Sequence, residues 1–80
     1  MTELTNNERI ILLGKALYGP WWKMETGRLC GVARYTIQRW VRGDYEPPDD
    51  AVVKVLRGAK QRRDEIDKAI KRATLYPWIT

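Results

Sequence analysis

The sequence predicts a small all-α domain with a long C-terminal helix. Three stretches carry apolar residues three and four positions apart, the spacing at which side chains share one face of an α-helix. Glycine and proline separate these stretches, at Gly19-Pro20, Gly31, Gly43 and Pro47-Pro48, and such residues end helices or form turns. Because the chain has 80 residues, we expect a single domain over 1–80.

The composition predicts a basic protein of a reducing compartment. Lys and Arg total 15 against 10 Asp and Glu, and residues 1–43 carry net +4 of the total +5. A positive face of this kind suits a polyanionic partner. A single cysteine permits no intramolecular disulfide, and the start MTELTNNE lacks the basic and apolar parts of a signal peptide. We therefore expect a cytoplasmic protein with no membrane-spanning segment.

The first helix is predicted to begin near Thr5 or Asn6, either of which can cap it, with Glu8 in its first turn. Its apolar stripe consists of Ile10, Leu13 and Leu17, widened by Ile11 and Leu12. The adjacent tryptophans that follow are expected to differ. Trp22 is predicted to fill the core, and Trp21 is the candidate for a self-association or partner surface.

The segment from Lys23 to Gly43 is the most informative part of the chain. It divides at Gly31 into two predicted helices, 23–30 and 32–42, and we expect Gly27 to allow a crossing helix to come close. Three residues of the second helix form an apolar stripe: Ile37, Trp40 and Val41. The opposite face has three arginines and no carboxylate, and consists of Arg34, Tyr35, Gln38, Arg39 and Arg42. Such a helix is suited to the major groove of DNA.

This segment resembles the helix-turn-helix of the Cro/repressor-like (Xre-type) DNA-binding proteins. With Lys23 as the first residue of the motif, the small fifth, glycine ninth, β-branched fifteenth and bulky eighteenth positions hold Gly27, Gly31, Ile37 and Trp40. The sequence departs from the motif at Thr26, where an aliphatic residue is usual, and at Ala33, where a polar cap is common. We expect the first departure to weaken the core and the second to fray the start of the helix.

The resemblance implies roles for six residues. Lys23 corresponds to a common phosphate contact, whereas Arg42, one turn beyond the base-reading positions, is expected to hold the DNA backbone. The positions that reach base edges hold Arg34, Tyr35, Gln38 and Arg39. Arginine can donate to both O6 and N7 of guanine, and glutamine can bond both N6 and N7 of adenine. Arg28 is either a second phosphate contact or a solvated surface residue.

Catalytic chemistry is not expected. The chain contains no histidine to activate Cys30, which we expect to pack as a small apolar residue. It also contains no zinc pattern and no phosphate-binding glycine loop, so no cofactor or metal is predicted. Asp49 and Asp50 are interpreted as the N-cap and first turn of the last helix rather than as a metal or acid–base pair.

The last helix is predicted over about 50–73. Its first half places Val52, Val55, Leu56 and Ala59 against the preceding helices. Its second half is charged and keeps only a thin stripe of Ile66, Ala69, Ile70 and Ala73, which predicts pairing with a second copy. The alternative is a helix folded back on the first one, or broken near Gly58. The apolar segment 75–79 is expected to cover a groove or to hold a protein partner.

These patterns predict a sequence-specific double-stranded-DNA-binding transcription regulator, acting as a homodimeric repressor on an inverted repeat. The build is similar to small phage and mobile-element regulators, including autorepressors encoded beside anti-CRISPR genes, which implies action on its own promoter. Two alternatives remain open: an antitoxin that binds both DNA and a toxin, and an interaction module without a DNA function. Substitution of Arg34 and Arg39 distinguishes these alternatives, because only DNA binding depends on them.

Overall fold

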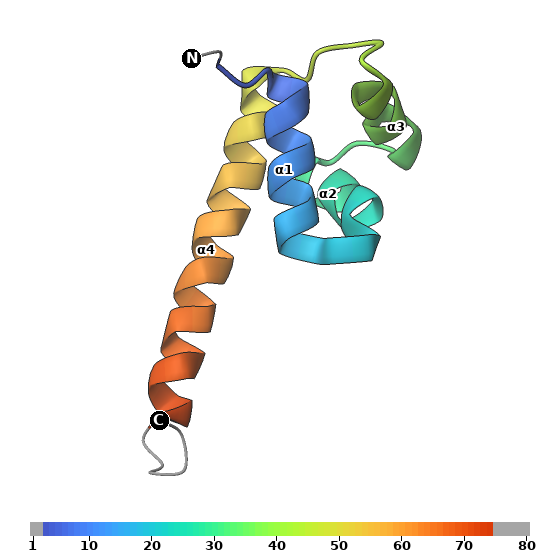
Figure 1. Cartoon of the computed structure of the whole chain (residues 1–80). Helices are drawn as coiled ribbons and strands as arrows, with labels where there is room; N and C mark the ends of the chain where they lie inside the picture. Colours follow the sequence, from blue (N-terminus) through green and yellow to red (C-terminus); the bar gives the residue numbers. More distant parts are fainter. Residues whose placement is uncertain (1–2, 75–80) are drawn as a thin grey trace.

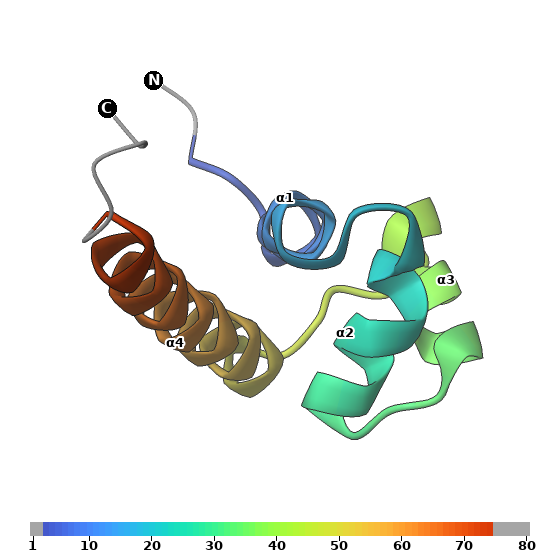
Figure 2. The ribbon, with the colours of Figure 1, turned by 90° about the horizontal axis from the view of Figure 1, so that it is seen from below.

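The computed structural model describes residues 3–74, and all regular secondary structure in that range is helical. Helix α1 (Asn6–Tyr18) leads through a 3₁₀ turn, η1 (Gly19–Trp21), into α2 (Trp22–Cys30). Helix α3 (Arg34–Arg42) and the long α4 (Asp49–Ala73) follow. Helices α2 and α3 lie to one side of α1, and α4 runs along α1 on the other (Figure 1; Figure 2, viewed from below). The all-α prediction is confirmed.

The helix ends follow their local sequence. Thr5 caps α1 in a capping box: its hydroxyl accepts from the Glu8 N–H, and its own N–H donates to Glu8 Oε1 at 2.9 Å. Hydrogen bonds from Thr5 to the Glu8 carboxylate, the one from the Thr5 backbone N–H first, lower the pKa of Glu8. Gly31 and Gly43 take left-handed conformations, with φ of 72° and 80°, at the ends of α2 and α3. The predicted breaks are therefore confirmed.

One core joins all four α-helices. Its buried apolar members are Ile10, Trp22, Cys30, Ile37, Trp40, Ala51 and Val55, with Leu13, Leu17, Leu29 and Val52 among the partly buried residues around them. The prediction that Leu12 widens the stripe of α1 is wrong, because this side chain is 59% exposed. Leu12 lies two residues after Ile10, about 200° around the helix, and therefore faces away from α2 and α4.

Two glycines let α2 pack closely against its neighbours. A Cβ on Gly14 of α1 would lie 2.7 Å from Trp22 Cε3. A Cβ on Gly27 would lie 3.0 Å from the carbonyl oxygen of Val32 and 3.6 Å from Ile37 Cγ1. The predicted close approach of a crossing helix at Gly27 is not what the structure has: the backbone of the turn comes closest, and Ile37 of α3 is at ordinary contact distance.

The departure at Thr26 leaves a polar atom in the core. The residue is fully buried, and its hydroxyl oxygen has no hydrogen-bond partner within residues 3–74. A buried hydroxyl without a partner costs roughly 1–3 kcal/mol. This agrees with the expected weakening of the core at the position where the motif usually has an aliphatic side chain.

Two asparagine amides tie the start of α1 to the α3–α4 loop. Asn6 Nδ2 donates to the carbonyl oxygen of Pro47 at 2.9 Å and to Asp49 Oδ1 at 2.8 Å. Asn7 Nδ2 donates to the carbonyl oxygens of Trp40 at 2.8 Å and Tyr45 at 2.7 Å. Each amide thus uses both of its N–H groups, so residues 40–49 are held by four hydrogen bonds from one helical turn.

The start of α4 differs from the prediction in one respect. Pro48 occupies the N-cap position, and Asp49 is the first helical residue rather than the cap. Its carboxylate accepts from Asn6 instead. Asp50 lies in the first turn as predicted, where it pairs with Lys54 at 3.3 Å.

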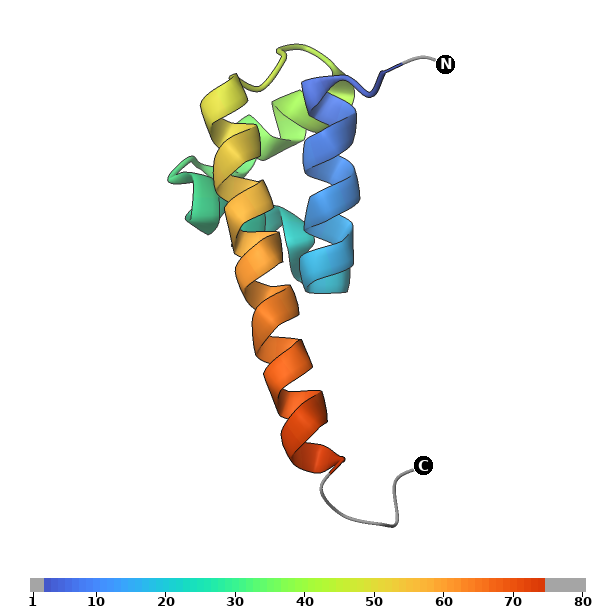
Figure 3. The ribbon, with the colours of Figure 1, turned by 90° about the vertical axis from the view of Figure 1, so that its left-hand side faces the viewer.

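Helix α4 is unbroken through Gly58, as predicted, so the alternative of a break there is excluded. Ala51 and Val55 are buried, but Leu56 is 40% exposed and does not cover the preceding helices as predicted. Leu56 follows Val55 and is therefore turned about 100° away from the buried face. Beyond Ala59 every residue to 74 is exposed, and the helix continues past the end of α1 (Figure 3). The predicted role of 75–79 falls outside the described residues.

We predict that Thr26→Val stabilises the protein by about 1 kcal/mol, because a methyl group replaces the unpaired hydroxyl at nearly constant volume. Urea denaturation at one fixed protein concentration measures the change as a higher midpoint with an unchanged slope. Thr36→Val is the matched control, since Thr36 is only partly buried. A lower midpoint for Thr26→Val would show that the hydroxyl has a stabilising partner.

Candidate nucleic-acid interface

The orientation of α3 is set by its buried side. Ile37 is fully buried and Trp40 is 5% exposed, and the two lie three residues apart on one face of the helix. Arg34, Tyr35 and Gln38 are consequently exposed on the other face. Val41 does not extend the buried stripe as predicted. It is 38% exposed, since it lies about 100° beyond Trp40 at the edge of the contact.

Helix α3 begins at Arg34, two residues later than the sequence predicts. Val32 and Ala33 belong to the turn, where the Val32 N–H donates to the carbonyl oxygen of Gly27 at 2.9 Å. Ala33 is extended, with φ −69° and ψ 152°, and makes no side-chain cap. The expected absence of a side-chain cap is therefore confirmed. As a result, no capping side chain accepts a hydrogen bond from the first backbone N–H groups of α3.

Lys23 brings the start of α2 beside α3. It is partly buried and lines two neighbouring surface hollows. One hollow joins it to Gln38, Val41 and Arg42, and the other joins it to Arg34 and the tryptophan pair. Four of the six predicted site residues, Lys23 included, therefore lie together, although they come from two helices.

Trp21 is an addition to the predicted site. Trp22 is buried, as predicted, whereas Trp21 is 69% exposed and lines the hollow that also contains Lys23, Met24 and Arg34. The sequence indicated that Trp21 belongs to a partner-binding surface. Because Trp21 shares this hollow with Lys23 and Arg34, that surface lies beside the basic face of α3. An aromatic ring flanked by cations and lacking a carboxylate neighbour in this hollow suits contact with a nucleic-acid backbone.

Arg39 is held by two tyrosines. Its Nη1 donates to Tyr35 Oη at 2.8 Å, and its guanidinium carbon lies 5.1 Å from the Tyr35 ring centroid. The same carbon lies 4.5 Å from the ring centroid of Tyr45, within the range of a cation–π interaction. Arg39 and Tyr35 thus form a second group beside the one around Lys23, and the guanidinium is oriented by the protein before any ligand binds.

Sequence reasoning missed Tyr45, which lies outside the helical patterns, in the loop between α3 and α4. The ring is 55% exposed, and its residue is fixed by the hydrogen bond from Asn7 to its carbonyl oxygen. Only the path of the chain after Gly43 brings this ring back over the side of α3. An aromatic residue three positions after the last helical arginine was the one available signal.

Arg42 is paired with the carboxylate of Asp44. Its Nε lies 3.5 Å from Asp44 Oδ2, and both side chains are well exposed. The reason is local, since Gly43 turns the chain back and brings Asp44 beside the last residue of the helix. An exposed pair of this kind contributes little to stability and is easily exchanged for a phosphate. Arg28 likewise lies on the surface, where it pairs with Glu25 at 3.2 Å.

Cys30 lies in the core and contacts the start of α4. Cys30 is 6% exposed and its Sγ lies 3.8 Å from the carbonyl oxygen of Ala51. Burial is the main cause that raises the pKa of its thiol, which disfavours the reactive thiolate. Residues 3–74 contain no group of three His, Cys, Asp or Glu side chains that could hold a metal ion. Within the same range, none of the helices has the length and apolarity needed to cross a membrane.

Comparison of the chain with models of known protein families, with curated proteins and with solved structures gave no significant match. The candidate interface therefore stands on its own residues and geometry.

We predict that Tyr45→Ala frees the Arg39 side chain, because it removes one of the two rings that hold the guanidinium. The measurement is ¹⁵N relaxation of the Arg39 Nε–Hε group by NMR, and the expected result is a lower order parameter. Tyr45→Phe is the control, since it keeps the ring and should leave the value unchanged. An Arg39 signal equally mobile in the wild type and in Tyr45→Ala would contradict this packing.

Proposed function

We propose that the protein is a sequence-specific double-stranded-DNA-binding transcription regulator that acts as a homodimeric repressor. The observation that carries the proposal is the outward face of α3. It presents Arg34, Tyr35, Gln38 and Arg42 to solvent, while Ile37 and Trp40 fix its rotation in the core. The helix itself has no carboxylate. Exposed, oriented guanidinium and amide groups are the groups that read base edges in the major groove.

The arrangement of α2 and α3 supports assignment of 23–43 to a helix-turn-helix of the Xre type. The two helices contact each other and are joined by a short turn with a left-handed glycine, Gly31. Gly27 is buried against the turn and close to Ile37, and Trp40 is in the core. These are the four residues on which the resemblance rests, and their positions at the turn and in the core support the proposed assignment.

The structure suggests a division of roles within the site. Lys23, at the start of α2, and Arg42, at the end of α3, flank Gln38 and are suited to phosphates. Within residues 3–74 Arg34 makes no ion pair, and neither Arg34 nor Gln38 makes a side-chain hydrogen bond, so both are suited to base edges. Arg39 is already oriented by Tyr35 and Tyr45, so it binds a base with little loss of side-chain entropy. Trp21 adds an apolar contact to the backbone next to Lys23.

A homodimer would place two α3 helices in successive major grooves, about 34 Å apart, over an inverted repeat. The described residues form one small helical unit, so the proposed regulation is by occlusion, in which the bound dimer excludes polymerase from a promoter. The protein's own promoter is the first candidate, by analogy with small regulators of similar build.

Selection of binding sites from random duplex DNA tests this proposal directly. We expect enrichment of a palindrome whose half-sites lie one helical turn apart, followed by a steep loss of affinity with salt on the selected sequence. If no sequence is enriched and binding disappears at physiological salt, the basic face is only electrostatic, and the protein is an interaction module rather than an operator-binding regulator.

Arg39 and Lys23 should differ in what they contribute. We predict that Arg39→Ala loses about 1–3 kcal/mol on the selected site and relaxes specificity at one base pair, because a base contact is removed. Lys23→Ala should weaken binding to all sequences alike and reduce the salt slope by about one, because a phosphate contact is removed. Fluorescence anisotropy on matched and mismatched duplexes measures both effects.

Arg57→Ala is the matched control, since it removes one positive charge from an exposed position on α4, away from α3. It should leave affinity and specificity nearly unchanged. Equal losses for Arg39→Ala on every duplex would show that Arg39 contacts the backbone rather than a base.

A further inference from the structure

The second half of α4 is a helix without a covering partner among the described residues. Ile66 is 49% exposed and Ile70 is 56% exposed, and every residue from Lys60 to Thr74 is exposed. The end of α1 reaches only the start of this half, near Ile66 and Asp67, and the helix then continues beyond α1 (Figures 1 and 3). A helix in water with one apolar stripe gains its stability by packing that stripe against another element.

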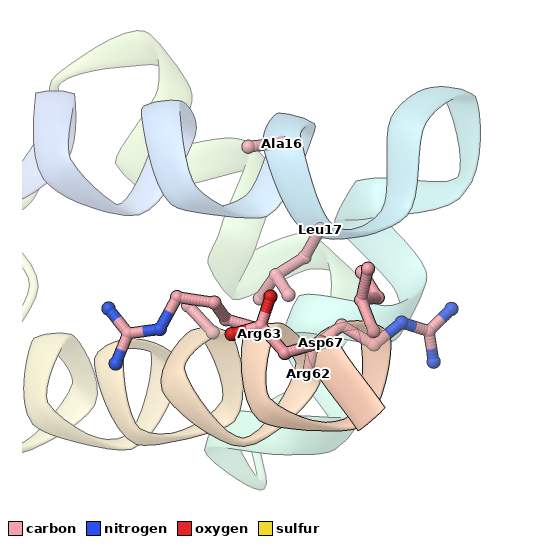
Figure 4. A pocket seen from close by; sticks show the side chains of 7 residues that line it. Ala16, Leu17, Arg62, Arg63 and Asp67 are labelled. Carbon is pink, nitrogen blue, oxygen red and sulfur yellow. The ribbon is translucent and has the colours of Figure 1, made fainter. Parts of the chain in front are cut away.

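A groove between α1 and α4 lies at the near end of this stripe. Its α1 side consists of Ala16 and Leu17, and its α4 side consists of Ala59, Arg62, Arg63, Ile66 and Asp67. In Figure 4, Leu17 points from α1 toward α4, and Arg62 and Arg63 extend in opposite directions with Asp67 between them. The floor is apolar, with small side chains at the two alanines, and the rim carries charges of both signs.

The apolar stripe follows the heptad repeat of a coiled coil. Spacings of four and three residues alternate along α4 through Val52, Leu56, Ala59, Arg63, Ile66, Ile70 and Ala73. These are successive d and a positions of a heptad, and six of the seven side chains are apolar. The stripe begins at Val52, which is partly buried against the core, and continues in the same register through the exposed Leu56 onto the second half of the helix.

We propose that this surface binds the same surface of a second copy, with the two α4 helices antiparallel and a two-fold axis near residues 64 and 65. Ile70 of one copy then lies opposite Ala59 of the other and fills the groove beside Leu17. A self-complementary patch related to itself by a two-fold axis is what an isologous dimer requires. This proposal gives the interface of the homodimer in the proposed function, and it rests on that function only for its biological purpose.

Arg63 decides the orientation of the two helices. In a parallel pair with matched heptads, Arg63 would face Arg63 of the other copy at a central position, where like charges repel and lose hydration. In the antiparallel pair Arg63 lies opposite Ile66, and its guanidinium can extend along the groove to solvent. Small and large residues also match in this arrangement, since the alanine at 59 faces an isoleucine rather than another alanine.

The flanking charges favour the same arrangement. Lys60 and Asp67 occupy e positions of successive heptads. In an antiparallel pair e positions face one another, so each Lys60 lies beside Asp67 of the other copy, twice in the dimer. In a parallel pair Asp67 would lie beside Arg62 instead, and Lys60 would lie beside the buried Val55, which leaves its charge without a partner.

Sedimentation equilibrium of the full chain without DNA tests the interface. We expect a reversible dimer whose dissociation constant rises at least roughly tenfold in Ile70→Glu, because a charge replaces an apolar side chain at a central position. Ile70 is half exposed in the single chain, so this variant should keep the helical circular-dichroism spectrum of the wild type. Lys68→Gln is the matched control, with the same change in net charge on the outer face of α4, and it should dimerise like the wild type.

A charge exchange tests the orientation. Lys60→Asp and Asp67→Lys should each weaken the dimer several-fold, and the double variant should recover most of the loss. A parallel pair gives the opposite result, because the lysine introduced at position 67 of the double variant would lie beside Arg62 of the other copy.

Three results would overturn the proposal: a wild-type protein that stays monomeric at hundreds of micromolar, an Ile70→Glu variant that dimerises normally, or a double variant weaker than both single ones. The first would assign the stripe to another occupant, such as residues 75–80 or a different protein. Because no DNA is present in these measurements, selection of an inverted repeat in the same protein would leave the proposed function standing even if this interface fails.

Discussion

Burial of Ile37 and Trp40 is the constraint on which the arrangement of the basic face depends. The two side chains lie in a core shared with Trp22, Cys30 and Val55, so α3 has one allowed rotation about its axis. Loss of a buried tryptophan or isoleucine typically costs about 2–5 kcal/mol, a large share of the stability of a domain this small. The same contact that stabilises the fold therefore determines which polar residues of α3 face solvent.

The side-chain hydrogen bonds of Asn6 and Asn7 fix the position of the loop after α3. Their four hydrogen bonds hold the carbonyl oxygens of Trp40, Tyr45 and Pro47 and the carboxylate of Asp49. The carbonyl oxygen of Pro47 is buried and needs such a partner, because the loop makes no regular secondary structure of its own. As a consequence, the ring of Tyr45 is fixed beside Arg39, and a residue at the start of α1 influences the orientation of a guanidinium on α3.

The apolar residues in the two halves of α4 are buried to very different degrees. Ala51 and Val55 are buried against α1 and α2, whereas Ile66 and Ile70 remain about half exposed. The near half buries Ala51 and Val55, which lie beside the heptad stripe, whereas the stripe itself is only partly buried at Val52 and is exposed at Leu56. The near half stabilises the monomer, and the exposed half has the pattern of a helix that pairs outside the single chain.

The sequence by itself determined the helices, their breaks and the polar face of α3, because these follow from 3.6-residue periodicity, glycine conformation and capping, all of which act over a few residues. It also determined that Trp22 is buried and Trp21 is not. Only the tertiary structure decided where each buried face ends, which left Leu12, Val41 and Leu56 exposed, and where α3 begins. These features depend on how far a neighbouring helix reaches. The pairing of Arg39 with Tyr45 and of Arg42 with Asp44 arose in the same way. Both depend on the path of the chain after Gly43. Hydrogen bonds from Asn7 hold this path in place, and their acceptors, Trp40 and Tyr45, lie 33 and 38 residues away in the sequence.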